Sequence, residues 1–274
     1  MTDADLIVPA GLDPGLLERG HVRVDRQGPL LRVRLDRPEA RNAQTPATWT
    51  ALAALGEWMQ GESDDIEAVV LTGEGPSFSA GLDRRMFSPE GIPGEVSLLS
   101  LARSDDDALD ASIAAAQAAF TWWRECAPLS IAAVQGHAIG AGFQLALACD
   151  VLLASPDAVF AMRETSYGLV PDLAGTSTLV RAIGYSRALE MCATGRLVAA
   201  EEGYALGFVT RIADDLEAAV DDLTRALGAA PPGAVRDLTG LLRGAQERSA
   251  EEQRAAERTA QARRLRSLLA ALGG

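Results

Sequence analysis

Two short segments of the chain place small residues where main-chain N–H groups would be open to a ligand. The first, TGEGPSFSAGLD, ends in residues 80–83 after a strand-like run, and in the second, VQGHAIGAGFQLALACD, residues 140–142 begin a helix. The first N–H groups of a helix lack intrahelical acceptors and carry partial positive charge, so they can hold an anion or a developing oxyanion. Either segment alone would also suit a tight turn, so the two have to be judged together.

The sequence lacks the residues that several other chemistries require. All 25 basic residues are arginine, which excludes a Schiff-base lysine, a pyridoxal-phosphate lysine and a Walker-A lysine. The two histidines, His21 and His137, cannot supply a three-histidine metal site, and no HExxH sequence occurs. Neither glycine-rich segment has GxGxxG spacing, and there is no GxSxG nucleophile elbow. We therefore expect no metal site and no separate cofactor.

Length and composition indicate an acidic globular protein. The 274 residues suit one large domain or a domain with an appendage, and 38 acidic against 25 basic residues argue against nucleic acid or an anionic membrane as a partner. The three cysteines are far apart in apolar settings, which is typical of buried free thiols in a reducing compartment. The N-terminus lacks the features of a signal peptide, and no stretch has the length of a membrane span. We expect a cytoplasmic protein.

Strands and helices alternate around these segments. In LLRVRL, Leu31, Val33 and Leu35 alternate with arginines, as in a half-buried strand. Thr45 followed by Pro46 is an N-cap and first-turn pair that opens a helix. The alternation continues to about residue 195 and predicts an α/β fold built from β-β-α units. Residues 87–107, rich in Gly, Pro, Ser and Asp, predict a functional loop.

The last part of the chain is mostly helical. Ser249 caps the final helix, which carries an apolar stripe near its end. The stripe either packs within the chain or contacts another subunit, and the sequence leaves both readings open. It consists of Leu265, Leu268, Leu269 and Leu272.

Taken together, the motifs resemble the enoyl-CoA hydratase/isomerase family, the crotonase superfamily. The likeness begins at LDRPEARNAQT, runs through AVVLTGEGPSFSAGLD, PLSIAAVQGHAIGAGFQLALACDVLLAS and AVFAMRETSYGLVPDLAGT, and ends near LEMCATGRLVAAEEGYALGFVTRI. The resemblance implies a crotonase-like spiral of β-β-α units over residues 21–197, after an extension at 1–20. It further implies a helical oligomerisation region at 198–274, trimers or dimers of trimers, and an acyl-CoA thioester substrate.

The resemblance also implies where the thioester binds. By position, its carbonyl oxygen would accept hydrogen bonds from the main-chain N–H groups of Ala80 and Ala141. Such donors stabilise an enolate because negative charge builds on the thioester oxygen. With no lysine in the chain, arginines must bind the CoA phosphates, and Arg85 is a further candidate for this role. The implied CoA and substrate contacts are Arg41, Ala43, Gly81, Leu82, Asp83, Arg84, Gly140 and Tyr167.

The acid/base positions depart from the hydratase pattern. Hydration in this family uses two glutamates that hold a water, and their positions here are occupied by Gln144 and Glu164. A glutamine can hydrogen-bond a water but cannot exchange a proton at neutral pH. Asp172 resembles the second proton carrier of the dienoyl-CoA isomerase branch, although it would also suit a helix cap. Arg163 stands next to Glu164, where it would either lower the pKa of that carboxyl or point away.

These residues favour an enoyl-CoA or dienoyl-CoA isomerase. Glu164 would be the principal proton carrier, Asp172 would assist, and Gln144 would position water or substrate. One alternative is an enoyl-CoA hydratase. Another is an acyl-CoA-binding protein that has lost turnover.

Overall fold

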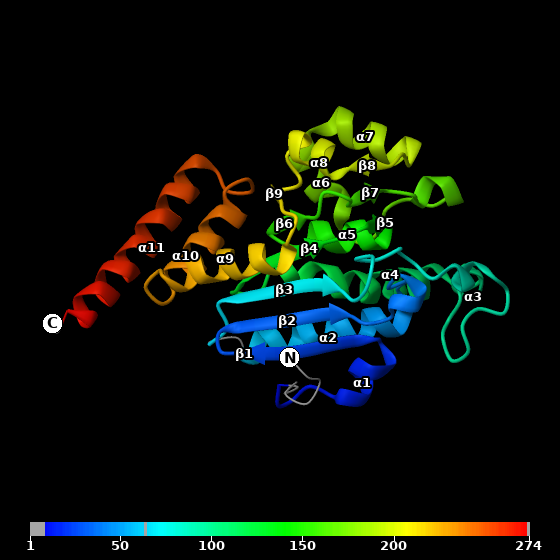
Figure 1. Cartoon of the computed structure of the whole chain (residues 1–274), viewed down its shortest axis with the longest axis horizontal. Helices are drawn as coiled ribbons and strands as arrows, with labels where there is room; N and C mark the ends of the chain where they lie inside the picture. Colours follow the sequence, from blue (N-terminus) through cyan, green and yellow to red (C-terminus); the bar gives the residue numbers. More distant parts are fainter. Residues whose placement is uncertain (1–8, 63–64, 273–274) are drawn as a thin grey trace.

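The computed structural model describes residues 9–62 and 65–272, and it has the predicted α/β architecture (Figure 1). The main sheet has six strands in the order β1-β2-β3-β4-β6-β9, and a smaller sheet has the order β5-β7-β8. All neighbours in the main sheet are parallel except β1 and β2. The strands are β1 (Val22–Gln27), β2 (Leu30–Leu35), β3 (Ala68–Gly73), β4 (Leu129–Val134), β5 (His137–Ile139), β6 (Val151–Ala154), β7 (Val159–Ala161), β8 (Val198–Ala199) and β9 (Arg211–Ile212).

Helices follow most of the strands and become continuous after β9. The α-helices are α1 (Pro14–Arg19), α2 (Pro46–Glu62), α3 (Leu98–Leu101), α4 (Asp106–Thr121), α5 (Ala141–Ala148), α6 (Gly175–Ile183), α7 (Tyr185–Thr194), α8 (Ala200–Leu206), α9 (Leu216–Gly228), α10 (Ala234–Gly244) and α11 (Ala250–Ala271). Short 3₁₀ turns are η2 (Pro38–Ala40), η3 (Arg84–Phe87), η4 (Trp122–Arg124) and η5 (Glu164–Tyr167). None of the described helices combines the length and apolar character needed to cross a membrane.

The main sheet is buried on both faces. Val69 and Leu71 of β3 belong to the large core cluster formed with α2 and α4, whereas Ala68 and Val70 belong to a second cluster formed with α9. Successive side chains of a strand point to opposite faces, so one strand contributes to both clusters. Because both faces of the sheet are covered, the ends of its strands are held in fixed positions. The two predicted site segments follow the ends of β3 and β4.

The predicted alternation of β2 is found, with one difference. Leu31, Val33 and Leu35 are buried as expected, but Arg32 is also only 9% exposed. Its guanidinium forms ion pairs with Glu217 at 2.6 Å and with Asp221 at 3.0 Å. Both acidic residues lie on α9, so the covering helix supplies the charges that make burial of an arginine tolerable.

The start of the described chain is more ordered than an extension. Residues 14–19 form α1, which Asp13 caps by accepting a 2.9 Å hydrogen bond from the Gly15 N–H. Leu12 and Leu17 belong to the large core cluster, so this segment packs against the domain. The rest of the predicted extension, residues 1–8, lies outside the described residues.

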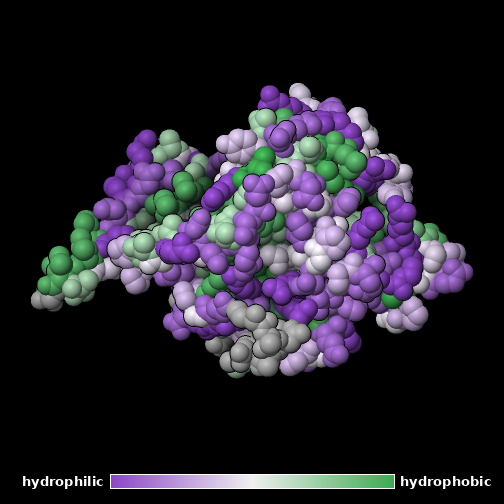
Figure 2. Space-filling model, viewed as in Figure 1, coloured by the Kyte–Doolittle hydropathy of each residue, from purple (hydrophilic) through white to green (hydrophobic). Residues whose placement is uncertain are grey.

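The last helix, α11, packs on α10 and extends away from the sheet (Figure 1). Ser249 caps α11 as predicted, and Glu252 completes a capping box. Arg243 of α10 ties this region to the core through an ion pair of 2.6 Å with Asp150. The leucine stripe does not pack within the chain: its members are 55–77% exposed, and Figure 2 shows an apolar patch at the free end of α11.

Candidate active site

The two small-residue segments lie side by side. Ser79 pairs with Ala138 of β5 in a parallel bridge, and the Ile139 N–H donates to the Ser79 carbonyl oxygen at 3.0 Å. Gly81 has a φ of 85°, and a Cβ added there would lie 2.3 Å from the Ile139 oxygen and 3.5 Å from the Ala141 nitrogen. Only glycine fits this position, both for its left-handed backbone and for the close approach. The fold therefore brings the end of the first segment against the first residue of α5.

The structure contradicts the prediction that Ala80 supplies an open amide. Its N–H donates to the carbonyl oxygen of Arg41 at 2.8 Å. This hydrogen bond joins the loop after β3 to the loop before α2, and no local sequence pattern predicts it. An amide already paired inside the fold is not free to receive a thioester oxygen.

Leu82 provides the open amide instead. The Gln44 N–H donates to the Gly81 carbonyl oxygen at 2.7 Å, and the Asp83 N–H donates to the Gln44 oxygen at 2.8 Å. The Leu82 N–H between them has no acceptor among the described residues, and neither does the N–H of Ala141 at the first position of α5. The left-handed turn at Gly81 separates the directions of the Ala80 and Leu82 amides. Leu82 was expected only as a substrate contact.

Gln144 and Glu164 form a direct pair. The Gln144 Nε2 donates to Glu164 Oε1 at 2.7 Å. The Gln144 Oε1 accepts from the Leu173 N–H at 2.9 Å and from the Gly175 N–H at 3.4 Å. Gln144 is 1% exposed, and the other carboxyl oxygen, Glu164 Oε2, is buried without a hydrogen-bond partner in the described part of the chain.

The pKa of the Glu164 carboxyl lies above the ordinary value for a glutamate. Burial raises its pKa, the nearby charge of Asp172 adds to the increase, and the bond from Gln144 acts in the opposite direction. Partial desolvation also raises the pKa of Asp172, although the residue as a whole is exposed, and its carbonyl oxygen accepts from Gln117 at 2.7 Å. In the described structure no ion pair joins Arg163 to Glu164. A raised pKa makes Glu164 a stronger proton acceptor than an ordinary glutamate.

The arginines predicted to bind CoA differ in their surroundings. Asp83 is buried between Arg37, at 2.7 Å, and Arg85, at 2.8 Å, and these hydrogen bonds hold the pKa of its carboxyl well below the ordinary value. Asp83 therefore holds the loop together, through an arginine that the sequence did not single out. Arg41 and Arg84 are exposed and make no ion pair within the described residues.

The remaining predicted contacts are Gly140, Tyr167 and Ala43, and they lie in three different parts of the chain. Gly140 has a φ of 53°, and a Cβ added there would lie 3.4 Å from Glu164 Oε1. Tyr167, 49% exposed in the η5 turn, stacks on Phe87 with ring centroids 5.1 Å apart. Phe87 ends η3 and begins the segment 87–107 that was predicted to be a functional loop; this segment also contains α3 and the start of α4. Ala43 is half-buried in the loop that precedes α2.

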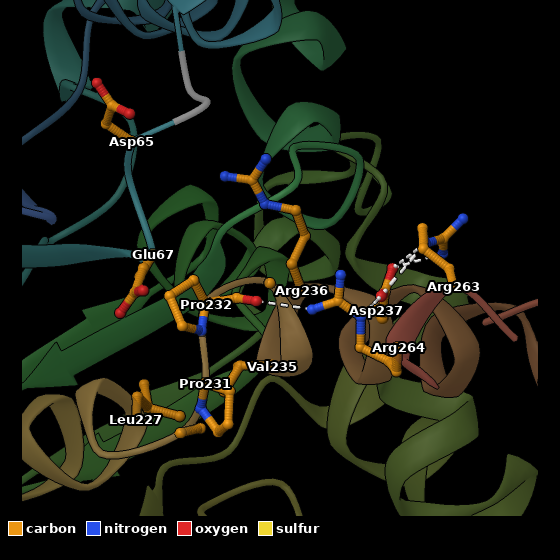
Figure 3. A pocket seen from close by; sticks show the side chains of 12 residues that line it. Asp65, Glu67, Leu227, Pro231, Pro232, Val235, Arg236, Asp237, Arg263 and Arg264 are labelled. Carbon is orange, nitrogen blue, oxygen red and sulfur yellow. Dashed lines mark hydrogen bonds and ion pairs between the residues drawn. The ribbon is translucent and has the colours of Figure 1, made fainter. Parts of the chain in front are cut away.

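A pocket of about 500 Å³ lies elsewhere, between the α9–α10 connection and α11 (Figure 3). Arg263 and Arg264 line it, and both pair with Asp237, at 2.5 and 2.7 Å. Arg264 also donates to the Pro232 carbonyl oxygen at 2.6 Å. These guanidinium groups already have acceptors, and none of the predicted site residues lines this pocket.

Fold and site define an α/β protein in which two open main-chain amides accompany a half-buried glutamate, Glu164. The model of the enoyl-CoA hydratase/isomerase family matches residues 25–267. The chain belongs to this family, the crotonase superfamily.

Individual relatives agree with this assignment. A solved structure described as an enoyl-CoA hydratase of Thermobifida fusca, in complex with acetoacetyl-CoA, is 42% identical, with a TM-score of 0.86 over 93% of this chain and 99% of that one. The carnitinyl-CoA dehydratase of Salmonella arizonae is 31% identical over 84% of this chain and 83% of its own length. A Mycobacterium bovis protein described as an enoyl-CoA hydratase is 33% identical over 67% of this chain. The match spans 66% of that relative, just under two thirds of its length.

Proposed function

We propose that the protein is an acyl-CoA isomerase that shifts a carbon–carbon double bond. The observation that carries the proposal is the pairing of Glu164 with an amide, Gln144, where hydration would need a second carboxyl group. A double-bond shift needs one group that removes a proton from one carbon and returns it to another. Glu164 alone can do both.

The reaction would proceed through an enolate. Glu164 removes a proton from the carbon next to the double bond, the C–H electron pair moves into the conjugated system, and negative charge reaches the thioester oxygen. The amides of Leu82 and Ala141 stabilise that charge, and one such donor is typically worth about 10²–10³ in rate. Glu164 then returns the proton to the far carbon of the allylic system. We propose Asp172, whose pKa is also raised, as a second proton carrier.

An acyl-CoA as the substrate has independent support. The Thermobifida fusca relative binds acetoacetyl-CoA and, in another structure, CoA. CoA is a polyanion, so a chain with a net charge of −13 must concentrate positive charge where CoA binds. Arg41 and Arg84 are exposed next to the site segments and supply that charge.

A hydratase is the second candidate, favoured by the names of the relatives. The Mycobacterium bovis and Thermobifida fusca proteins are both described as enoyl-CoA hydratases. In such a reaction Glu164 would have to activate the water and protonate the substrate alone, because the side chain at position 144 is an amide and not a second carboxyl group.

We also propose that copies of the chain associate through their C-terminal helices, as a homotrimer or a dimer of trimers. The support is the exposed apolar stripe on α11, which nothing in the described chain covers. Apolar patches of this kind mark interaction surfaces.

The test is an assay of purified protein with 3-enoyl-CoA and dienoyl-CoA substrates, followed by the absorbance change on shifting the double bond. We expect turnover, and we expect Glu164→Gln to lower kcat by about 10²–10⁴. Glu57→Gln, an exposed residue of α2, is the matched control and should behave as wild type.

Other outcomes would decide between the rivals. No change with either substrate class would contradict the isomerase proposal. Water addition to a 2-enoyl-CoA, lost in Glu164→Gln, would establish the hydratase instead. Tight acyl-CoA binding without product from a broad thioester panel would indicate a protein that has lost turnover.

A further inference from the structure

Gln144 has only one amide orientation that satisfies its surroundings. Its Oε1 receives the Leu173 N–H at 2.9 Å and the Gly175 N–H at 3.4 Å. A rotated amide would turn its NH₂ group toward these two donors and leave them without an acceptor, which is costly in a buried site. The orientation is therefore fixed by the chain that leads into α6.

Packing holds the same side chain from another direction. A Cβ added to Gly175 would lie 2.8 Å from the Gln144 Cγ and 3.1 Å from Oε1. A glycine is thus required at the start of α6 for Gln144 to lie where it does. With Oε1 held and the side chain enclosed, Nε2 is directed at Glu164 Oε1, 2.7 Å away.

The consequence concerns the two oxygens of Glu164. Oε1 accepts the bond from Gln144, and Gly140 lies beside the same oxygen, where an added Cβ would be 3.4 Å away, in van der Waals contact. Oε2 is buried and lacks a partner among the described residues. An unpaired buried carboxyl oxygen is costly, and such groups persist where they have a functional role.

We propose that Gln144 is a positioning residue: its fixed amide holds Glu164 Oε1 and thereby makes Oε2 the atom that exchanges protons with the substrate. This inference rests on the proposed function for the identity of the substrate, but not for the geometry. It gives Gln144 a role different from that of a water-activating group. Because an amide donor favours the ionised carboxylate, Gln144 also keeps Glu164 available as a base.

The direct test measures the Glu164 carboxyl without any substrate. Protein labelled with ¹³C at the glutamate side-chain carboxyl is titrated by NMR, and the Glu164 resonance is the one missing in Glu164→Gln. In Gln144→Leu the donor is lost, so we expect the pKa of Glu164 to rise by about one unit or more. Gln135→Leu is the matched control, because that glutamine donates only to main-chain oxygens at Gly73 and Gly75.

Gln144→Glu tests the same inference in a variant that keeps an acceptor for both main-chain donors, Leu173 and Gly175. One new oxygen would take the Leu173 and Gly175 bonds, and the other would face Glu164 Oε1. Two carboxylates at such a distance share a proton, so the pair should titrate together with an apparent pKa above that of wild-type Glu164.

Kinetics supply a second readout. A base must be ionised, so kcat/KM should rise with pH through the pKa of Glu164 and then level off. In Gln144→Leu and Gln144→Glu this acidic limb should move to higher pH, whereas loss of fold would lower activity at every pH. Unchanged titration of Glu164 in both variants would overturn the inference. A shifted titration in a protein that turns over no thioester would uphold the positioning of the Glu164 carboxyl by Gln144 and reject the isomerase proposal.

Discussion

At the scale of single residues, the oxyanion site depends on which amide is open. Ala80 and Leu82 are two positions apart, and the left-handed Gly81 between them, with a φ of 85°, turns the chain. The Ala80 N–H donates to the Arg41 carbonyl oxygen, and the Leu82 N–H has no acceptor in the described structure. Side-chain substitutions test this weakly, because both donors are main-chain groups.

Replacing the amide by an ester removes the N–H and keeps the side chain. An ester at Leu82 should lower kcat by about 10²–10³. It should lower the melting temperature less than an ester at Ala80 does, because it removes no internal N–H donor and only weakens the Gly81 carbonyl oxygen as the acceptor of the Gln44 N–H. An ester at Ala80 should instead lower the free energy of unfolding by about 1 kcal/mol, since its N–H bonds to Arg41.

The two esters serve as controls for each other. Both ester proteins are made by nonsense suppression with the matching α-hydroxy acids. Urea unfolding then measures the free energy of unfolding, and a thioester assay measures kcat. Loss of kcat at position 80 with none at position 82 would restore the assignment made from the sequence.

The sequence predicts the chemical types of the site residues better than their partners. Motifs that are local in the chain indicate the glycines and carry the family resemblance, which implies the roles of Glu164 and Ala141. The Ala80–Arg41 and Asp83–Arg37 contacts join residues 39 and 46 positions apart, taking the difference of the sequence numbers. No local pattern reports such pairings, because they depend on how two loops meet.

At the scale of elements, α5 begins against the loop after β3. A Cβ added to Gly142, in the first turn of α5, would lie 2.4 Å from the Ser79 carbonyl oxygen. Strand and helix periodicity predicted that α5 begins near this point, and the structure starts it at Ala141. Periodicity does not report how closely the helix approaches the neighbouring loop, and that distance decides whether the Ala141 and Leu82 amides lie near each other.

Gly142→Ala should therefore destabilise the protein by roughly 1–3 kcal/mol, because a methyl group has no space against the main chain of Ser79. It should also lower kcat by displacing residues 79–82. Gly240→Ala in α10 is the matched control: its Cβ meets nothing within 4 Å, so alanine should stabilise the helix by about 0.4–1 kcal/mol. Urea unfolding of both variants measures the difference, and equal effects would contradict the packing argument.

At the scale of the whole molecule, α10 and α11 leave apolar surface exposed. Leu265, Leu268, Leu269 and Leu272 follow helical spacing of three, four and seven residues and are 55–77% exposed. The sequence could not decide whether this stripe packs inside the chain. In the described structure the stripe does not pack inside the single chain, because α11 extends away from the sheet (Figure 1).

A second copy of the chain is the occupant we expect for the stripe. Sedimentation velocity at micromolar concentrations should show a mass above the 28.8 kDa of one chain. The double variant Leu265→Glu with Leu269→Glu should shift the protein to monomer, because burying charges against an apolar partner is strongly unfavourable. Val96→Glu is the control, since Val96 is also exposed, at 62%, but lies in the loop before α3. A wild-type monomer, or a double variant that sediments as wild type does, would show that the stripe does not join copies of the chain.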